Sequence, residues 1–93
     1  MTRKSYRTIA EQVIEVINSR DEARGALSAR TTKYIGCAMF LKQERKGQLI
    51  DMLLKNQLPA SAKLCKDIKD TLIDDIAYSL ELLARIEEVE LPF

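Results

Sequence analysis

Carboxylates and thiols are the side chains of this sequence that could do chemistry. Asp70, Asp74 and Asp75 stand close together in a segment with helical periodicity. On a helix, Asp74 and Asp75 would point about 100° apart, whereas Asp70 and Asp74 are four residues apart and would share a face. A metal site would need further ligands, and no helical motif in the sequence supplies them. We therefore interpret these carboxylates as a solvated acidic face.

The two thiols, Cys37 and Cys65, lie far apart in apolar-periodic segments, and the sequence contains no CxxC motif and no histidine. This excludes the Cys₂His₂ and Cys₄ types of zinc site. It also removes the usual Ser–His and Cys–His arrangements of nucleophile and base, and no glycine-rich phosphate loop is present. We predict a non-enzyme without catalytic, cofactor-binding or metal-binding residues, and two buried free thiols in a reducing cytosol.

The length and composition favour one small helical domain. A chain of 93 residues buries only about 60–65% of its unfolded surface, so an isolated monomer would be marginally stable. Three glycines and two prolines are too few for an all-β fold, which needs frequent turns. The N-terminal "MTRKSYRTIAEQ" has no apolar core of a signal peptide, and the longest apolar run is too short to span a bilayer. We expect a soluble cytoplasmic protein that makes no contact with a membrane.

The apolar periodicity predicts four helices, at about residues 5–18, 20–44, 46–56 and 60–89. In the first, Tyr6, Ile9 and Val13 share one face with the neighbouring apolar residues. Ser19 and Glu22 have the spacing of a capping box, in which each side chain bonds to a free backbone N–H group. The capping box predicts that the first helix ends near residue 18 and that a second begins at residue 20.

Residues 34–41, "YIGCAMFL", are apolar nearly all round, which predicts that this half of the second helix is buried on more than one side. A buried strand is the rival interpretation, because periodicity does not separate the two. Gly47 predicts a helix end or a kink, although the continuity of the helix through Lys42–Gln48 stays open. Pro59 predicts the end of the third helix, because proline disfavours helical geometry in the residue before it.

The predicted last helix becomes apolar over much of its circumference from Ile73 onward. One short bundle has too few neighbouring helices to cover this amount of apolar surface. An apolar excess of this kind marks association, most simply in a two-fold homodimer. A face kept for another protein is the alternative. The fold class that we predict is therefore all-α, a small oligomeric bundle of about four helices with a long C-terminal helix. The predicted partner or oligomer interface comprises Ile73, Ala77, Leu80, Leu82, Leu83, Ile86 and Val89.

Charge is unevenly distributed along the chain. Residues 1–50 hold ten Lys or Arg against five Asp or Glu, and residues 51–93 hold five against nine. Opposite charges of this kind attract each other within a bundle or between subunits, and they also suit a charged partner. Two basic clusters are candidates for charged contacts with a partner: Arg3, Lys4 and Arg7, and then Lys42, Arg45 and Lys46.

Residues 47–70 have the outline of a helix-turn-helix: a short apolar helix, a break at "NQLP", and a helix that opens with small and basic residues. In this alternative the DNA contacts would be Ser61, Lys63, Lys66 and Lys69. The break is long and lacks the usual glycine. In addition, phosphate would repel Asp67 and Asp70.

In its small size, its charge asymmetry and its lack of catalytic residues, the chain resembles a type of small bacteriophage regulator. Antirepressors, which disable a transcription repressor by binding it directly, are one example of this type. The resemblance rests on no specific motif, so it assigns a role to no residue. It implies a regulatory protein that binds another protein, for example a repressor. We also expect the chain to associate with itself as a homo-oligomer. A DNA-binding transcription regulator is the alternative.

Overall fold

The computed structural model describes residues 3–57 and 61–88, and within these ranges the chain is all-helical. The all-α fold class is thereby confirmed. The helices are α1 (Tyr6–Arg24), α2 (Thr32–Leu41), α3 (Gln43–Leu54) and α4 (Ala62–Glu88), with a short 3₁₀ helix, η1, at Leu27–Ala29. The length and composition predict a single domain, but the chain divides into two compact units, residues 1–30 and 31–93.

The first unit is built on α1, which is longer than predicted. Ser5 caps its start by accepting a hydrogen bond from the Thr8 N–H at 3.2 Å. Ser19 lies inside the helix, so the predicted break near residue 18 is wrong. Helix propagation adds a hydrogen bond for each residue fixed, which favours continuing past a local capping signal. The helix ends at Gly25, whose φ of 88° is a conformation that glycine adopts without a Cβ clash.

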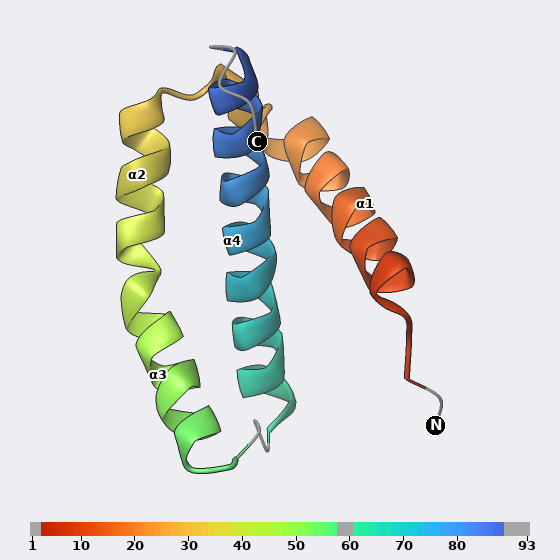
Figure 1. The fold of residues 1–93 in the computed structure, drawn as a ribbon, viewed down its shortest axis with the longest axis vertical. Helices are drawn as coiled ribbons and strands as arrows, with labels where there is room; N and C mark the ends of the chain where they lie inside the picture. Colours follow the sequence, from red (N-terminus) through yellow and green to blue (C-terminus); the bar gives the residue numbers. More distant parts are fainter. Residues whose placement is uncertain (1–2, 58–60, 89–93) are drawn as a thin grey trace. The chain divides into compact units, whose positions relative to one another are not determined.

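The second unit is a helical hairpin, in which α2 and α3 follow one another along one side and α4 runs back beside them (Figure 1). Lys42 joins α2 to α3 without a large change of direction, since its φ and ψ are −87° and −8° and its N–H bonds back to the carbonyl of Met39 at 3.1 Å. Gly47 lies inside α3, so a helix end at Gly47 is wrong; the helix end within Lys42–Gln48, which the sequence left open, is at Lys42. The second predicted helix, 20–44, is thus divided between α1, η1 and α2, and α3 begins at Gln43.

The C-terminus of α3 is a Schellman motif. The Asn56 N–H bonds to the Leu53 carbonyl at 3.0 Å, and the Gln57 N–H bonds to the Met52 carbonyl at 2.9 Å. Asn56 has a φ of 56°, the left-handed conformation that asparagine tolerates better than most residues. These bonds satisfy the terminal carbonyls of α3 before the chain reverses. Pro59, to which the sequence analysis attributes this helix end, lies outside the described residues.

The core of the hairpin is thin. Its buried residues are Ile35 on α2, which is 0% exposed, together with Ile68, Thr71 and Ile73 on α4. Thr71 is compatible with burial because its hydroxyl donates to the Asp67 carbonyl at 3.0 Å. A hairpin of two helical arms covers only one side of each arm, which leaves little surface enclosed.

Two predictions about burial are wrong for this reason. Residues 34–41 form a helix, as expected, but Ile35 is the one buried residue among them. Phe40 and Leu41 are 70% and 77% exposed. Cys37 and Cys65 form no disulfide with each other, and both are exposed, whereas the sequence predicted buried thiols. Among the described residues, no helix combines the length and the apolar character needed to cross a bilayer.

Candidate interaction surfaces

Among the described residues, three ion pairs join the two arms of the hairpin. Lys42 Nζ lies 3.0 Å from Asp74 Oδ2, and Lys46 Nζ lies 2.9 Å from Asp75 Oδ2. Arg45 Nη1 lies 3.0 Å from Asp67 Oδ2. All three cations come from the α2–α3 arm and all three carboxylates from α4. We call this set of pairs the ionic row.

The ionic row sets the alignment of the two arms more than it stabilises them. Its side chains are half-exposed, so each pair contributes only about 0.5 kcal/mol after screening by water. A slide of α4 by one turn would nevertheless separate all three pairs together. Asp75 is the most enclosed member, at 18% exposure. Its Oδ1 atom is buried and has no hydrogen-bond partner among the described residues.

The ionic row changes the meaning of two predicted sets. Lys42, Arg45 and Lys46 are candidates for partner contacts in the sequence analysis, but here they form ion pairs within the hairpin. The carboxylates interpreted as a solvated face include Asp74 and Asp75, which are half-buried members of these pairs. The attraction between the basic and acidic halves of the chain is therefore realised, at least in part, inside the molecule.

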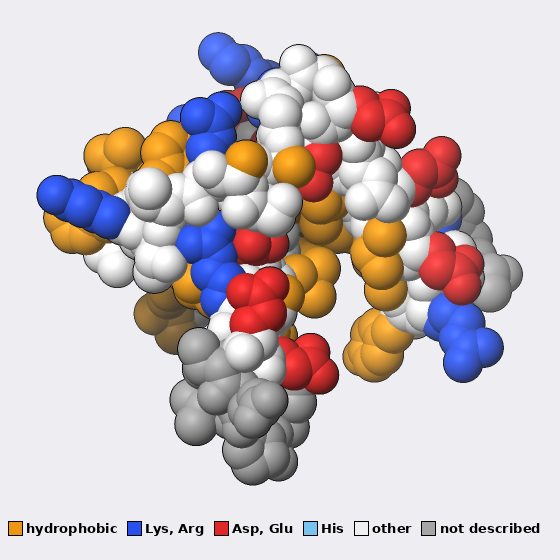
Figure 2. All heavy atoms as spheres, turned by 90° about the horizontal axis from the view of Figure 1, so that it is seen from above, with side chains coloured by type: hydrophobic (Ala, Val, Ile, Leu, Met, Phe, Trp, Pro, Cys, Tyr) orange, Lys and Arg blue, Asp and Glu red, His pale blue; other side chains and the backbone are white. Residues whose placement is uncertain are grey.

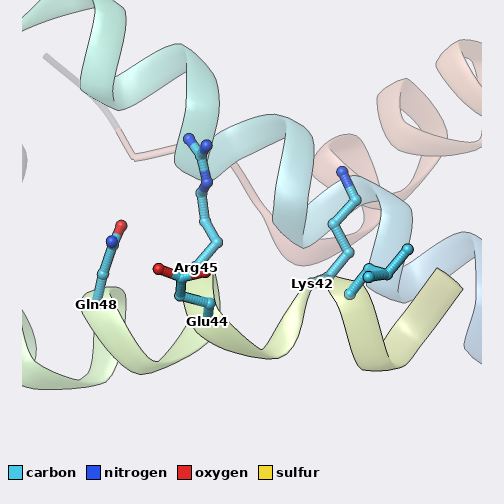
Figure 3. A pocket seen from close by; sticks show the side chains of 5 residues that line it. Lys42, Glu44, Arg45 and Gln48 are labelled. Atoms are coloured by element: carbon cyan, nitrogen blue, oxygen red, sulfur yellow. The ribbon is translucent and has the colours of Figure 1, made fainter. Parts of the chain in front are cut away.

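A hollow of about 360 Å³ beside the row is lined by Leu41, Lys42, Glu44, Arg45 and Gln48. Figure 3 shows Lys42 and Arg45 extending from the α2–α3 arm toward α4. Because both cations are engaged there, the hollow offers a ligand chiefly the Glu44 carboxylate and the Gln48 amide. These groups provide no arrangement of nucleophile and base.

A second polar contact fastens the open end of the hairpin. Arg85, near the end of α4, donates from Nη1 to the Thr32 hydroxyl at 2.8 Å and lies with Nε 3.2 Å from Glu81 Oε1. Next to it, Thr31 caps α2 by accepting from the Tyr34 N–H at 3.1 Å. The first turn of α2 is thus held to the last turns of α4.

An exposed apolar row runs along α4 at helical spacing, and we call it the α4 stripe. Its five side chains are each 41–46% exposed, although they lie on the longest helix of the molecule. Successive members are three or four residues apart, so they share one face. The α4 stripe consists of Leu72, Ile76, Leu80, Leu83 and Ile86.

The α4 stripe overlaps only partly with the interface predicted from the sequence. Leu80, Leu83 and Ile86 belong to both, whereas Ile73 is buried and Ala77 and Leu82 are half-buried. Val89 lies outside the described residues. Leu72 and Ile76 belong to the α4 stripe but not to the predicted interface. The helical spacing of 72, 76, 80 and 83, with steps of four, four and three residues, was the signal that could have identified them.

A second apolar surface lies on α2 and was not predicted. Tyr34, Cys37, Phe40 and Leu41 are all exposed. Cys37 is three residues from Tyr34 and three or four from Phe40 and Leu41, so the four side chains lie within one broad face of α2. We call these four residues the α2 patch. Figure 2 shows hydrophobic side chains uncovered on the α2–α3 side of the hairpin, at the left of the view.

The N-terminal basic cluster makes local contacts. Arg3 donates to the Tyr6 hydroxyl at 3.0 Å, and its guanidinium carbon lies 5.3 Å from the centre of the Tyr6 ring. Lys4 Nζ donates to Gln12 Oε1 at 3.1 Å. A shallow hollow of about 360 Å³ is lined by residues 3–6. Arg7 is exposed on the first turn of α1.

The residues of the predicted helix-turn-helix have mixed roles. Lys63, Lys66 and Lys69 are exposed at the start of α4. Ser61 instead caps this helix, since its hydroxyl accepts from the Leu64 N–H at 3.2 Å. The helices of a helix-turn-helix cross at about 90–120°. By contrast, α3 and α4 lie side by side and run in opposite directions (Figure 1).

Comparison of the chain with models of protein families, with curated proteins and with solved structures gave no match. Among the residues that the structure describes, no group of three or more Cys, Asp or Glu side chains is arranged to hold a metal ion.

Proposed function

We propose that this protein is a small regulatory protein that acts without catalysis, by binding another protein through the α2 patch. The observation that carries the proposal is the exposure of Phe40 and Leu41, at 70% and 77%, beside Tyr34 and Cys37 on one helical face. Large aromatic and aliphatic side chains gathered in this way are typical of the centre of a protein interface.

The surroundings of the α2 patch indicate the chemistry of the partner. Lys33 is the one charged residue within α2, and Lys42 just beyond it is engaged with Asp74. The partner surface that fits is therefore apolar, with a pocket or groove that accepts the Phe40 ring. A transcription repressor is the class of target suggested by the resemblance to phage antirepressors. Binding would then act by mass action, stabilising a repressor state that does not engage its operator.

The test compares the wild-type protein with Phe40→Asp as baits in a quantitative affinity capture from the source cell. Leu54→Asp is the matched control, because Leu54 is 82% exposed but lies on α3. We expect the wild-type protein and Leu54→Asp to retain the same partner protein. In calorimetry, the purified partner should bind Phe40→Asp at least about tenfold more weakly than it binds the wild-type protein. Equal binding by both variants would refute the role of the α2 patch. If the captured protein is a repressor, its operator binding should fall as this protein is added.

A DNA-binding regulator is the second candidate, and the exposure of Lys63, Lys66 and Lys69 at the start of α4 is the observation that favours it. Its test is fluorescence anisotropy of a labelled mixed-sequence duplex at about 50 and about 200 mM salt. Micromolar binding that weakens steeply with salt would support it. No binding at the lower salt concentration would leave protein binding as the proposal.

A further inference from the structure

We propose that the α4 stripe is covered by α4 of a second copy of the chain, running antiparallel, in a two-fold dimer centred near Ser79. This inference does not depend on the proposed function, which uses a different helix. Three features of the described residues carry it: the spacing of the α4 stripe, the charges at its two ends and the thin core of the hairpin.

The spacing along α4 matches a helix–helix seam. Four members of the α4 stripe form this seam together with Ser79, which lies beside the fifth member, Leu80. The seam residues Leu72, Ile76, Ser79, Leu83 and Ile86 are separated by alternating steps of four and three residues, the repeat that keeps one stripe of a helix against a neighbouring helix. Four of the five are apolar side chains about 41–45% exposed. The central position is Ser79, whose small exposed side chain allows the two helices to approach closely at the two-fold axis.

The charges select the antiparallel orientation. The first turns of α4 carry the exposed Lys63, Lys66 and Lys69, whereas its last turn carries the exposed Glu87 and Glu88. A parallel pair would bring like charges together at both ends. An antiparallel pair brings the basic start of one helix to the acidic end of the other, which is favourable at both ends.

The positions of Lys69 and Glu87 also fix the register. They are about five turns apart at 3.6 residues per turn, so both project from the same edge of the α4 stripe. In an antiparallel pair centred between them, Lys69 of one copy faces Glu87 of the other, and two-fold symmetry generates this contact twice. The centre of this register is residue 78, next to Ser79.

The second copy supplies what the hairpin lacks. Within the part of the hairpin that the structure describes, four residues are buried, Ile35, Ile68, Thr71 and Ile73. A unit of this size with so little enclosed surface is marginal by itself. Two hairpins joined through their α4 stripes form a layer of four helical arms, in which each α4 is covered on a second side.

Sedimentation equilibrium at about 100 µM protein tests the dimer. We expect a mass of twice the 10.6 kDa of one chain. Ile76→Asp should weaken dimerisation at least about 100-fold, because it places two carboxylates in the apolar seam. Leu54→Asp, which is on α3, should leave the dimer intact. A monomeric wild-type protein at this concentration would overturn the proposal. The opposite pattern, a monomeric Leu54→Asp variant and a dimeric Ile76→Asp variant, would also overturn it.

Charge exchange tests the orientation with exposed residues whose replacement does not threaten the fold. Lys69→Glu and Glu87→Lys should each weaken dimerisation about tenfold, since each places like charges at two symmetric contacts. An equal mixture of the two variants, and the double variant, should recover wild-type affinity. Unchanged affinity in the single variants, or a double variant weaker than either single one, would overturn the antiparallel register.

Oxidative cross-linking provides an independent readout of the same geometry. In a Cys37→Ser background, the natural Cys65 thiols should give no covalent dimer, because antiparallel packing places them at opposite ends of the seam. Ser79→Cys in a chain lacking both natural thiols should give a covalent dimer on mild oxidation. Rapid cross-linking through Cys65 would instead show a parallel pair and overturn the proposed orientation.

Discussion

The unit of residues 1–30 and the unit of residues 31–93 have similar apolar patterns but different burial. No residue of α1 is buried, and Tyr6, Ile9 and Ile14 are among its exposed apolar side chains. The hairpin has a small buried core and three ion pairs between its arms. Amphipathic periodicity therefore predicts which face of a helix is suited to burial, but a packed neighbouring helix decides whether that face is buried.

The largest expected difference in the free energy of unfolding is between two isoleucine replacements, one in each unit. Ile35→Ala should lower the free energy of unfolding by about 2–4 kcal/mol, because the side chain is 0% exposed and its removal leaves a cavity. Ile14→Ala, at a half-exposed position on α1, should change it by less than about 0.5 kcal/mol. Urea denaturation followed by circular dichroism measures both values. Equal losses would contradict the difference between the units.

The caps of α1 and α2 give an effect of intermediate size. Thr31→Ala removes the acceptor for the Tyr34 N–H and should cost about 1 kcal/mol in the unfolding of the hairpin. Ser5→Ala removes the equivalent acceptor in α1 and should increase fraying of its first turn without shifting the hairpin transition. Amide hydrogen exchange distinguishes local fraying from global unfolding. A hairpin transition lowered by Ser5→Ala would show that the two units unfold together.

The smallest effect is expected for the ionic row. A double-mutant cycle on Lys46→Met and Asp75→Asn should give a coupling energy of about 0.5–1 kcal/mol, since the pair is half-exposed and partly screened. The cycle on Lys55 and Asp51, a more exposed pair within one turn of α3, should give about 0.3–0.5 kcal/mol. Urea denaturation at low and high salt provides both energies. A larger coupling for the α3 pair would contradict a role for the ionic row in aligning the arms.

Local signals in the sequence were sufficient for some elements. The predicted last helix, 60–89, corresponds to α4 at Ala62–Glu88, and the predicted start of the first helix corresponds to α1 at Tyr6. The capping box at Ser19 and Glu22 was misleading, because a continuous helix satisfies the same backbone groups. Gly25 follows the end of α1 and Asn56 follows the end of α3, both with positive φ. Glycine and asparagine tolerate this conformation by their own chemistry, so both helix ends have a local signal in the sequence.

The candidate surfaces were less predictable than the helices. The α2 patch belongs to the segment with the strongest apolar signal, and its composition alone indicated burial. The α4 stripe was recognised in part, through Leu80, Leu83 and Ile86. Pairing of Lys42, Arg45 and Lys46 with α4 carboxylates joins residues that are far apart in the chain, and no local pattern specifies such partners.

The sequence by itself determined that this chain is helical and which residues share each helical face, because the 3.6-residue repeat is a local property of the backbone. The tertiary structure decided which faces are covered, that the thiols are exposed and that the basic cluster at the α2–α3 joint is neutralised within the hairpin. These outcomes depend on the number and alignment of neighbouring helices. In the hairpin, two packed arms bury Ile35 and leave Phe40 and Leu41, on the same helix, at the surface.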